Sequence, residues 1–504
     1  MKIKTEVLII GGGATGAGIA RDLALRGIPY VLIEKGDFAS GASGRNHGLL
    51  HSGGRYAVSD PEAARECIAE NMILRKIAPH CIEETEGLFV SLPEDDLQFR
   101  DRFLRACEEA GIPNALCSRD ETLAWEPELR PDLLSAVKVP DGAIDPFKLI
   151  LENAKDAENH GAEFFLHTEV TSLLIEGSNI KGVEAKDLAT GEEFSIDASF
   201  FINATGAWAN QVLKLAGLHI GMALSKGSLL ITNRRLTHRV INHCRQPSDG
   251  DIVVPNETVS ILGTTSIRLE EIEKFEVTPH EVSLLVRETS KMIPAIQEAR
   301  FIRAYAGIRP LFQSEAEGND RAISRGFALI DHGKRDGIKN LITITGGKLM
   351  TYRLMSEKTS DLICKKMGKE VACSTQLNPL PGANRPAGSR ERLKQFLTDG
   401  GEILCDCELV QRKEVEGFLE KEGLKDFQDI LHRTRLAKGT CQGGFCVYRL
   451  LGVLHQLRMA GGDSNKILKG FLEERWKGIR PILWGTALKE EELLESIYKG
   501  IFNL

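Results

Sequence analysis

The feature that most constrains this chain is a glycine triplet set between two apolar runs near its beginning. Residues 7–10 (Val-Leu-Ile-Ile) run directly into Gly11-x-Gly13-x-x-Gly16, and an Ala- and Leu-rich stretch follows as far as Gly27. A continuous run of branched residues predicts a buried parallel strand, and the next stretch predicts a helix that ends at the glycine. We therefore expect a strand, a tight turn and a helix.

A turn of this kind predicts a dinucleotide site. Gly11 permits the turn, Gly13 lets a pyrophosphate approach the backbone, and Gly16 lets the helix pack against the strand, so that phosphates meet the positive helix end. Glu34 follows the second apolar run. A carboxylate there accepts a hydrogen bond from a ribose hydroxyl and repels a 2′-phosphate, which disfavours NADP.

Composition limits the remaining classes. The 504 residues are 42% hydrophobic and 27% charged, which is typical of a soluble globular chain of two to four domains. A formal net charge of -7 gives no general attraction to nucleic acid. No apolar run is long enough to span a bilayer, and residues 1–4 lead into the first strand rather than into a signal peptide. We expect a cytoplasmic chain that reaches a membrane through a partner.

Two later segments repeat the opening pattern. Residues 199–206 and 341–347 each place an apolar run before glycine and a helix, so both are expected to return to the first sheet. Residues 36–56 are rich in small side chains and are expected to line the second half of the cofactor. A nicotinamide-binding domain does not normally require three junctions between a strand and a glycine turn, whereas FAD would contact all three, so the pattern favours FAD.

The rest of the chain divides by composition. A β-rich block within residues 217–301 predicts an inserted antiparallel sheet, and the Pro- and Gly-rich residues 378–388 predict a linker. The expected fold is α/β, with a Rossmann-like FAD-binding domain, an antiparallel substrate domain and a mostly helical cysteine domain. The expected boundaries are 1–90, 147–216 and 302–378 for FAD binding, 91–146 and 217–301 for substrate, 379–391 for the linker, and 392–504 for the C-terminal domain.

Several motifs together resemble those of the FAD-dependent glycerol-3-phosphate dehydrogenases, above all the anaerobic branch. They are the glycine triplet and residues 42–56, 305–311, 324–326 and 345–353. The resemblance implies an FAD domain of the glutathione reductase and D-amino-acid oxidase type. It also implies oxidation of sn-glycerol 3-phosphate to dihydroxyacetone phosphate, with electrons passing to quinone. The implied partners are small flavin and iron–sulfur subunits, of which the second anchors the complex to the inner face of the cell membrane.

The resemblance assigns the substrate contacts. Arginine forks suit a phosphate dianion, and the residues that match the family pattern are Arg55, Tyr56, Arg309, Arg325 and Lys348. His51 is the candidate base for the substrate hydroxyl, because an imidazole accepts a proton near neutral pH. Alternatively, His51 only hydrogen-bonds the flavin or the substrate, while Arg309 or Lys348 polarises the hydroxyl.

The motifs and the resemblance also assign the FAD contacts. They lie in four segments, and the expected residues are Gly11, Gly13, Ala14, Thr15, Gly16, Glu34, Lys35, Ser40, Ser43, Arg45, Asn46, His47, Gly48, Leu50, Ala204, Thr205, Gly206, Trp208, Gly346, Gly347, Lys348, Leu349, Met350 and Thr351. Alternative functions are an oxidase that uses oxygen, a flavin enzyme for amino or hydroxy acids, and a flavin-bound scaffold without activity. The basic motifs favour a phosphate substrate over an amine.

Four of the 11 cysteines form two close pairs, Cys405 with Cys407 and Cys441 with Cys446. Four thiolates so placed can hold Zn²⁺ or a [2Fe-2S] cluster, and the basic residues 432–438 favour ionised thiols. The segment resembles ferredoxin-like domains related to bacterioferritin-associated ferredoxin, which implies [2Fe-2S]. A one-electron relay beside a flavin also favours iron. Zinc and free thiols remain the alternatives.

Overall fold

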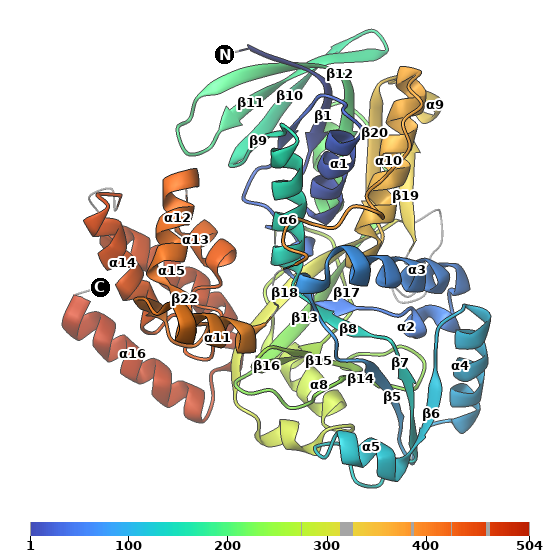
Figure 1. The fold of residues 1–504 in the computed structure, drawn as a ribbon, viewed down its shortest axis with the longest axis vertical. Coiled ribbons are helices and arrows are strands. Elements are labelled where there is room, and N and C mark those ends of the chain that lie inside the picture. Colours follow the sequence, from blue (N-terminus) through green and yellow to red (C-terminus); the bar gives the residue numbers. More distant parts are fainter. Residues whose placement is uncertain are drawn as a thin grey trace.

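The computed structural model describes residues 2–273, 275–312, 326–384, 388–424, 426–459 and 464–502. Two sheets with their helices lie one beyond the other along the long axis, and a helical C-terminal part lies beside them (Figure 1). Among the described residues, no helix has the length and apolar character needed to cross a membrane.

The first sheet has eight strands and is centred on β1 (Lys2–Ile10). β1 pairs in parallel with β2 (Tyr30–Ile33) on one side and with β12 (Glu193–Asn203) on the other, and β12 pairs in parallel with β20 (Leu341–Gly346). The prediction that both later apolar runs return to this sheet is confirmed. The other strands are β9 (Glu163–Phe165), β10 (Thr168–Glu176), β11 (Asn179–Asp187) and β19 (Phe327–Asp331).

Helices α1 (Ala14–Leu25), α6 (Pro146–Asn159) and α10 (Tyr352–Met367) pack together beside this sheet, as Figure 1 shows. Local sequence fixes their ends. The side chain of Asp145 accepts a hydrogen bond from Lys148 N and caps α6 ahead of Pro146, and Gly368 ends α10 in the left-handed conformation. Buried Arg21 of α1 donates to Asp156 of α6 at 2.6 Å and so ties the two helices together.

The second sheet has nine strands and is mainly antiparallel, which confirms the expected inserted sheet. β18 (Phe301–Phe312) pairs along its length with β13 (Met222–Thr232). This pairing assigns β18 to the second sheet, although the sequence motif within it suggested the FAD-binding part. The other strands are β5 (Gly87–Ser91), β6 (Ala115–Ser118), β7 (Ser135–Val139), β14 (Val240–His243), β15 (Ile252–Asn256), β16 (Val259–Gly263) and β17 (Ile267–Leu269).

Shorter elements complete the two parts of the molecule that contain these sheets. A small sheet joins β3 (Leu49–Leu50), β4 (Ile82–Glu83) and β8 (Gly142–Ile144). The helices are α2 (Gly54–Ala57), α3 (Pro61–Ile77), α4 (Leu97–Glu109), α5 (Arg119–Trp125), α7 (Ala209–Lys214), α8 (Pro279–Thr289) and α9 (His332–Arg335).

The C-terminal part has a hydrophobic core of its own, which includes Leu404, Val415, Ile430, Leu450 and Leu454. A core of this kind is the mark of a separate domain. Its elements are α11 (Ser389–Asp399), β21 (Ile403–Cys405), β22 (Val410–Gln411), α12 (Arg412–Glu422), α13 (Phe427–Thr434), α14 (Cys446–Gln456), α15 (Ser464–Ile479) and α16 (Thr486–Phe502).

Among the described residues, four ion pairs join this domain to the first sheet and its helices. They are Arg433 with Asp37, Arg435 with Asp145, Lys421 with Glu158 at 2.9 Å, and His167 with Asp429 at 2.7 Å. The ring of His432 also stacks on Phe147, with 5.1 Å between centroids. The start of the expected linker is itself packed, because Leu380 N donates to Ile77 O at 2.8 Å. The C-terminal domain is thus attached by specific contacts.

Candidate active site

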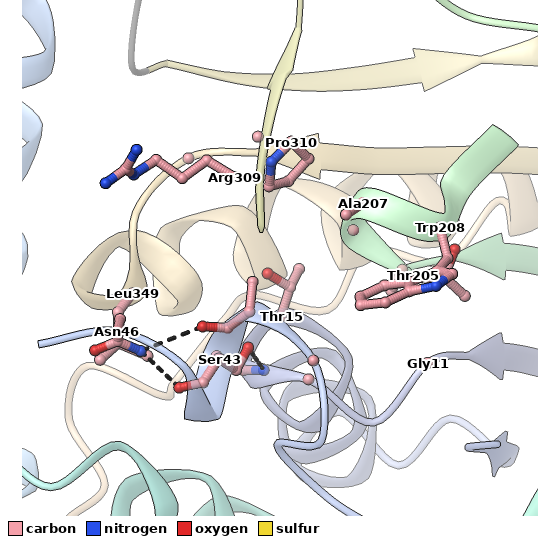
Figure 2. Close-up of a pocket in the computed structure, with 18 of the residues that line it drawn as sticks. Gly11, Thr15, Ser43, Asn46, Thr205, Ala207, Trp208, Arg309, Pro310 and Leu349 are labelled. Carbon is pink, nitrogen blue, oxygen red and sulfur yellow. Dashed lines mark hydrogen bonds between the residues drawn. The ribbon is translucent and has the colours of Figure 1, made fainter. Parts of the chain in front are cut away.

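A cavity of about 1440 Å³ is lined by residues from both sheets. Its walls include the ends of β1, β2 and β12, the turn before α10, and Arg309 and Pro310 of β18. Figure 2 shows Ser43 and Asn46 on one side of the cavity and Thr205 and Trp208 on another. The cavity exceeds the roughly 300–1,000 Å³ of ordinary small-molecule sites, so a dinucleotide and a small substrate can share it.

The turn between β1 and α1 meets the geometric demands of its glycines. Gly11 has a φ of +113°, and a Cβ there would lie 2.7 Å from Ala204 O. A Cβ at Gly16 would lie 1.8 Å from Gly11 O, so this glycine lets α1 begin against the turn. Gly13 caps α1 without a side chain, and Ser43 Oγ accepts from Ala14 N at 2.9 Å. The helix N-terminus therefore faces the cavity without an acidic residue.

Glu34 lies at the end of β2 and lines the same cavity. Its carboxylate accepts hydrogen bonds from Gly12 N at 2.6 Å and from Gly36 N at 2.8 Å, which fix its position. An ionised carboxylate has about four acceptor positions, so Glu34 can still accept a bond from a ribose hydroxyl. The bare helix terminus, this acid and the glycine turns fit FAD.

The cationic end of the cavity contains Arg55, Arg309 and Lys348. Arg309 donates to Thr265 O at 3.2 Å, and a Cβ at Gly227 would lie 2.2 Å from its Nη2, so the arginine crosses β13 at a glycine. Lys348 Nζ lies 4.9 Å from the centre of the Tyr56 ring. These residues come from α2, β18 and the turn before α10, and a phosphate group suits their combined charge.

Two histidines lie beside these cations. The ring centroids of His47 and His51 are 5.7 Å apart, and that of His51 is 5.5 Å from Tyr56. Burial, with the charges of Arg309 and Arg55, lowers the pKa of His47 to about 3, so His47 is neutral at physiological pH. Leu49 N donates to His47 Nδ1 at 3.2 Å, which leaves the proton on Nε2. His51 is buried and lines the cavity.

Six residues expected to contact FAD are not among those lining the cavity, namely Gly16, Arg45, Gly48, Leu50, Met350 and Thr351. Their neighbours explain this. Leu50 and Met350 are buried in the core, the Arg45 guanidinium lies 5.2 Å from the centre of the Phe275 ring, and Thr351 Oγ1 accepts from Lys348 N. The other expected FAD contacts, and His51, Arg55, Tyr56, Arg309 and Lys348, do line it. Arg325 lies outside the described residues.

The structure adds wall residues that the sequence did not indicate. Residues 168–171 and Leu188 line the cavity with Glu34, and Gln246, Pro247 and Thr264 line it with Arg309. None of them stands in a glycine motif. Their place depends on strand pairing between distant segments, which no local pattern reveals.

The four paired cysteines meet in the C-terminal domain. Cys446, the first residue of α14, hydrogen-bonds Cys405 at the end of β21, and this bond lowers the pKa of the Cys405 thiol to about 7. Cys407 contacts Cys441, whose pKa is raised by burial and by Cys407. Among the described residues, no group of three or more His, Cys, Asp or Glu side chains surrounds a position suited to a single metal ion. The sulfurs are arranged as two pairs.

Comparison with known proteins places this geometry in a family. The model of the FAD dependent oxidoreductase family matches residues 6–353. The chain is 46% identical to a subunit of the anaerobic glycerol-3-phosphate dehydrogenase of Escherichia coli, over 99% of this chain and 97% of that protein. It is 41% identical to a subunit of the anaerobic glycerol-3-phosphate dehydrogenase of Haloferax volcanii, over 100% of this chain and 91% of that protein.

A solved structure has a similar fold. The glycerol-3-phosphate dehydrogenase of Bacillus halodurans, complexed with FAD, aligns with a TM-score of 0.65 and 22% identity, over 96% of each chain. The family model covers the cavity residues described above as far as Lys348 and Leu349. The chain therefore belongs to the FAD dependent oxidoreductase family, in the branch that contains these anaerobic glycerol-3-phosphate dehydrogenase subunits.

Proposed function

We propose that this chain oxidises sn-glycerol 3-phosphate to dihydroxyacetone phosphate with FAD as its cofactor. The observation that carries the proposal is the cationic end of the cavity, where Arg55, Arg309 and Lys348 lie beside two histidines. A dinucleotide turn lines the same cavity. The names of the two relatives from Escherichia coli and Haloferax volcanii support the same substrate.

The three cations bind the phosphate and orient the substrate. Arg55 and Arg309 offer guanidinium forks to the phosphate oxygens, and Lys348 adds a point charge. Tyr56, under Lys348, limits the space at this end of the cavity. Arg325 belongs to the same proposed phosphate set through its motif. FAD, when bound, supplies the acceptor for the hydride from C2.

His51 acts as the base for the proton of the C2 hydroxyl. His47 is a poor candidate, because a group with a pKa of about 3 holds a proton weakly, and its Nε2–H suits a hydrogen-bond donor instead. The alternative role for His51 is hydrogen bonding alone, with Arg309 or Lys348 polarising the hydroxyl.

The two cysteine pairs hold a [2Fe-2S] cluster in this proposal. Each iron of such a cluster takes two thiolates, and the contacts of Cys405 with Cys446 and of Cys407 with Cys441 supply two such pairs. Zinc, by contrast, requires four ligands that converge on one point. The cluster supplies one-electron transfer when bound. Arg435 and Lys438 lie close to the pairs in sequence, but Arg435 is itself paired with Asp145 and Glu408.

The chain then works within a larger enzyme that passes electrons to quinone. Both relatives are named as subunits, which supports an assembly of several chains. We propose that the partners are small flavin and iron–sulfur subunits, the second of which is a membrane anchor. The chain itself would be cytoplasmic and would reach the inner face of the cell membrane through the anchor.

An anaerobic absorbance spectrum of the purified chain tests the proposal. Glycerol 3-phosphate should bleach the visible flavin bands, and iron–sulfur absorption should remain and then respond to dithionite. A flavin-loaded protein that glycerol 3-phosphate does not bleach would overturn the substrate assignment. Rapid hydrogen peroxide formation in air, equal to the substrate consumed, would instead indicate an oxidase.

A further inference from the structure

We propose that Asp251 is a positioning residue that holds the Arg55 guanidinium ready for the substrate phosphate, an inference that rests on the proposed function. Asp251 lies directly before β15 and is fully buried. Arg55 lines the cavity, whereas Asp251 does not. The aspartate therefore acts on a ligand through the arginine.

The contact between the two residues has a defined geometry. Arg55 Nη2 donates to Asp251 Oδ2 at 3.1 Å and to Ser248 O at 3.2 Å, and Ser248 N donates to the same Oδ2. Within the part of the chain that the structure describes, both of these polar contacts of Arg55 use Nη2. The contacts leave Nε and Nη1 for a phosphate in the cavity.

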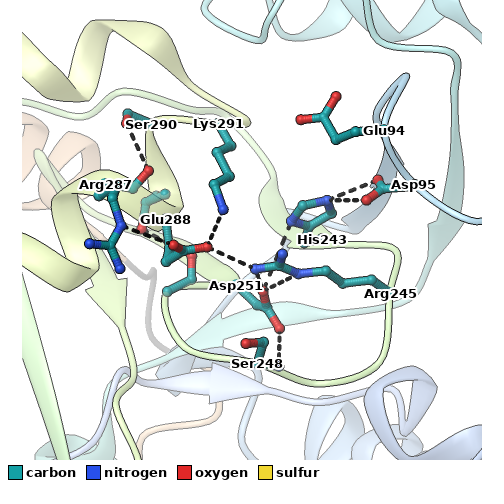
Figure 3. Close-up of polar contacts among 12 residues, drawn as sticks. Glu94, Asp95, His243, Arg245, Ser248, Asp251, Arg287, Glu288, Ser290 and Lys291 are labelled. Carbon is teal, nitrogen blue, oxygen red and sulfur yellow. Dashed lines mark hydrogen bonds and ion pairs between the residues drawn. The ribbon is translucent and has the colours of Figure 1, made fainter.

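Asp251 is itself fixed from the other side, as Figure 3 shows. Its Oδ1 accepts from Arg245 Nε at 3.0 Å and Nη2 at 2.8 Å, and Arg245 also contacts Glu288 at 3.4 Å. His243 lies between Asp95 and Asp251, with its Nε2 at 2.8 Å from the former and its Nδ1 at 4.0 Å from the latter. The carboxylate thus has little freedom to turn.

The arrangement explains how Arg55 can be ordered and still attract an anion. A mobile arginine side chain has rotamer entropy, which a ligand must overcome to fix it. The buried carboxylate fixes Arg55 in advance. Asp251 also pairs with Arg245, and Arg309 and Lys348 line the cavity together with Arg55, so this end of the cavity remains cationic.

The same carboxylate also shapes the cavity wall. Gln246 and Pro247 line the cavity and lie in the short loop between β14 and β15. The bond from Ser248 N to Asp251 closes this loop. Loss of the Asp251 charge therefore weakens phosphate binding through Arg55, the residue of this pair that lines the cavity.

A double-mutant cycle tests the role in the FAD-loaded protein, with Asp251→Asn, Arg55→Gln and the double variant. Binding of dihydroxyacetone phosphate is measured by calorimetry, and KM and kcat are measured for glycerol 3-phosphate. Asp251→Asn should weaken binding and raise KM about tenfold with kcat nearly unchanged, since one charged hydrogen bond is lost. The double variant should bind no more weakly than Arg55→Gln alone.

Glu126→Gln is the matched control, because Glu126 is a buried carboxylate whose hydrogen bonds come from His238 N and Arg239 N and not from this network, and it should bind like the wild type. If the losses of affinity caused by Asp251→Asn and Arg55→Gln multiply in the double variant, the positioning role is overturned. An Asp251→Asn variant with unchanged affinity would overturn it as well. Neither result would affect the proposed function. A wild-type protein that neither binds dihydroxyacetone phosphate nor is bleached by glycerol 3-phosphate would overturn the proposed function as well.

If Asp251→Asn does not fold, a second variant tests the same positioning role. Arg245→Gln leaves the bond between Asp251 and Arg55 but frees the other carboxylate oxygen. It should weaken binding by about threefold, a smaller effect than loss of the carboxylate charge. Unchanged binding in this variant, with the fold intact, would count against the positioning role.

Discussion

The cavity and the cysteine pairs are two candidate redox sites built in opposite ways. The cofactor end of the cavity is made largely by backbone, with glycines at the ends of parallel strands and a helix terminus whose N-cap residue is itself a glycine. The cysteine site is made by four sulfurs of a small helical domain, two of them in its hydrophobic core. One site depends on the shape of the chain, and the other depends on four atoms.

This difference predicts which changes each site tolerates. A backbone site fails when a side chain fills the space that glycine leaves, and many of its other residues can vary. A thiolate site fails when a single sulfur is lost, whatever the surrounding fold. The two sites should therefore be separable by substitution, and the following variants test that separation.

The largest effect is expected for Cys446→Ser. It removes one sulfur from the contact with Cys405, so iron bound per chain should fall to background while glycerol 3-phosphate still bleaches the flavin. Cys373→Ser, which changes a half-buried cysteine outside the pairs, should retain its iron. In both variants, iron analysis measures the iron bound per chain and anaerobic spectra measure the bleaching of the flavin. Loss of flavin bleaching in Cys446→Ser would show that the sites are not separable.

His51→Gln should slow flavin reduction by about 100- to 10,000-fold, the usual contribution of a general base, with FAD content unchanged. Stopped-flow absorbance under anaerobic conditions measures the rate. His160→Gln, at the exposed end of α6, is the control and should behave like the wild type. A loss of less than about tenfold would favour the alternative in which Arg309 or Lys348 polarises the hydroxyl.

Arg433→Gln tests whether the two regions are held together by buried charge. It leaves Asp37 buried without its partner, since the side chains are 16% and 4% exposed, and should cost about 2 kcal/mol of stability. Arg449→Gln breaks an exposed pair with Asp406 and should cost under about 0.5 kcal/mol. Urea denaturation compares the two variants. Equal losses of stability in the two variants would mean that the buried pair with Asp37 stabilises the protein no more than an exposed ion pair does.

The smallest effect concerns pH. The pKa of His47 falls from 6.5 to about 3 on folding, so between these values the unfolded chain binds a proton that the folded chain does not. Stability from this group is present above pH 6.5 and is lost as the pH falls toward 3. After allowance for partial exposure, lowering the pH from about 7 to about 5 should cost about 1 kcal/mol through His47.

Urea denaturation at the two pH values measures this loss in the wild type and in His47→Gln. The variant should show a shallower dependence on pH. An identical dependence in both proteins would mean that His47 is not held neutral by its surroundings.

Sequence patterns predicted the first sheet well because its central strands are buried on both faces. Residues 199–203 and 341–345 could therefore be assigned to it from apolar runs alone. The glycine turn could also be predicted, because a side chain at Gly11 or Gly16 would collide with nearby backbone atoms. The sequence did not reveal β18 as a strand of the second sheet, since its partner β13 lies about 80 positions earlier.

The contacts around the cations were beyond local patterns for the same reason. Arg55 and Asp251 are 196 positions apart, and nothing near Asp251 marks it as a partner of an arginine. The expected FAD contacts that do not line the cavity, such as Leu50 and Met350, neighbour true wall residues, and their side chains enter the core instead. A motif indicates a segment, whereas the pleat and the helix turn decide which of its residues face a ligand.

The order of strands in the first sheet has a consequence for synthesis. β1 leaves the ribosome first, but its neighbour β12 follows nearly 200 residues later, and β20, which leads to the turn at Gly346–Leu349, follows after 340. Contacts so distant in sequence form slowly, and domains generally fold as units once their chain is available. The nascent N-terminal turn therefore waits, exposed, for most of translation. Cofactor capture is expected to be a late event that follows completion of the strand framework.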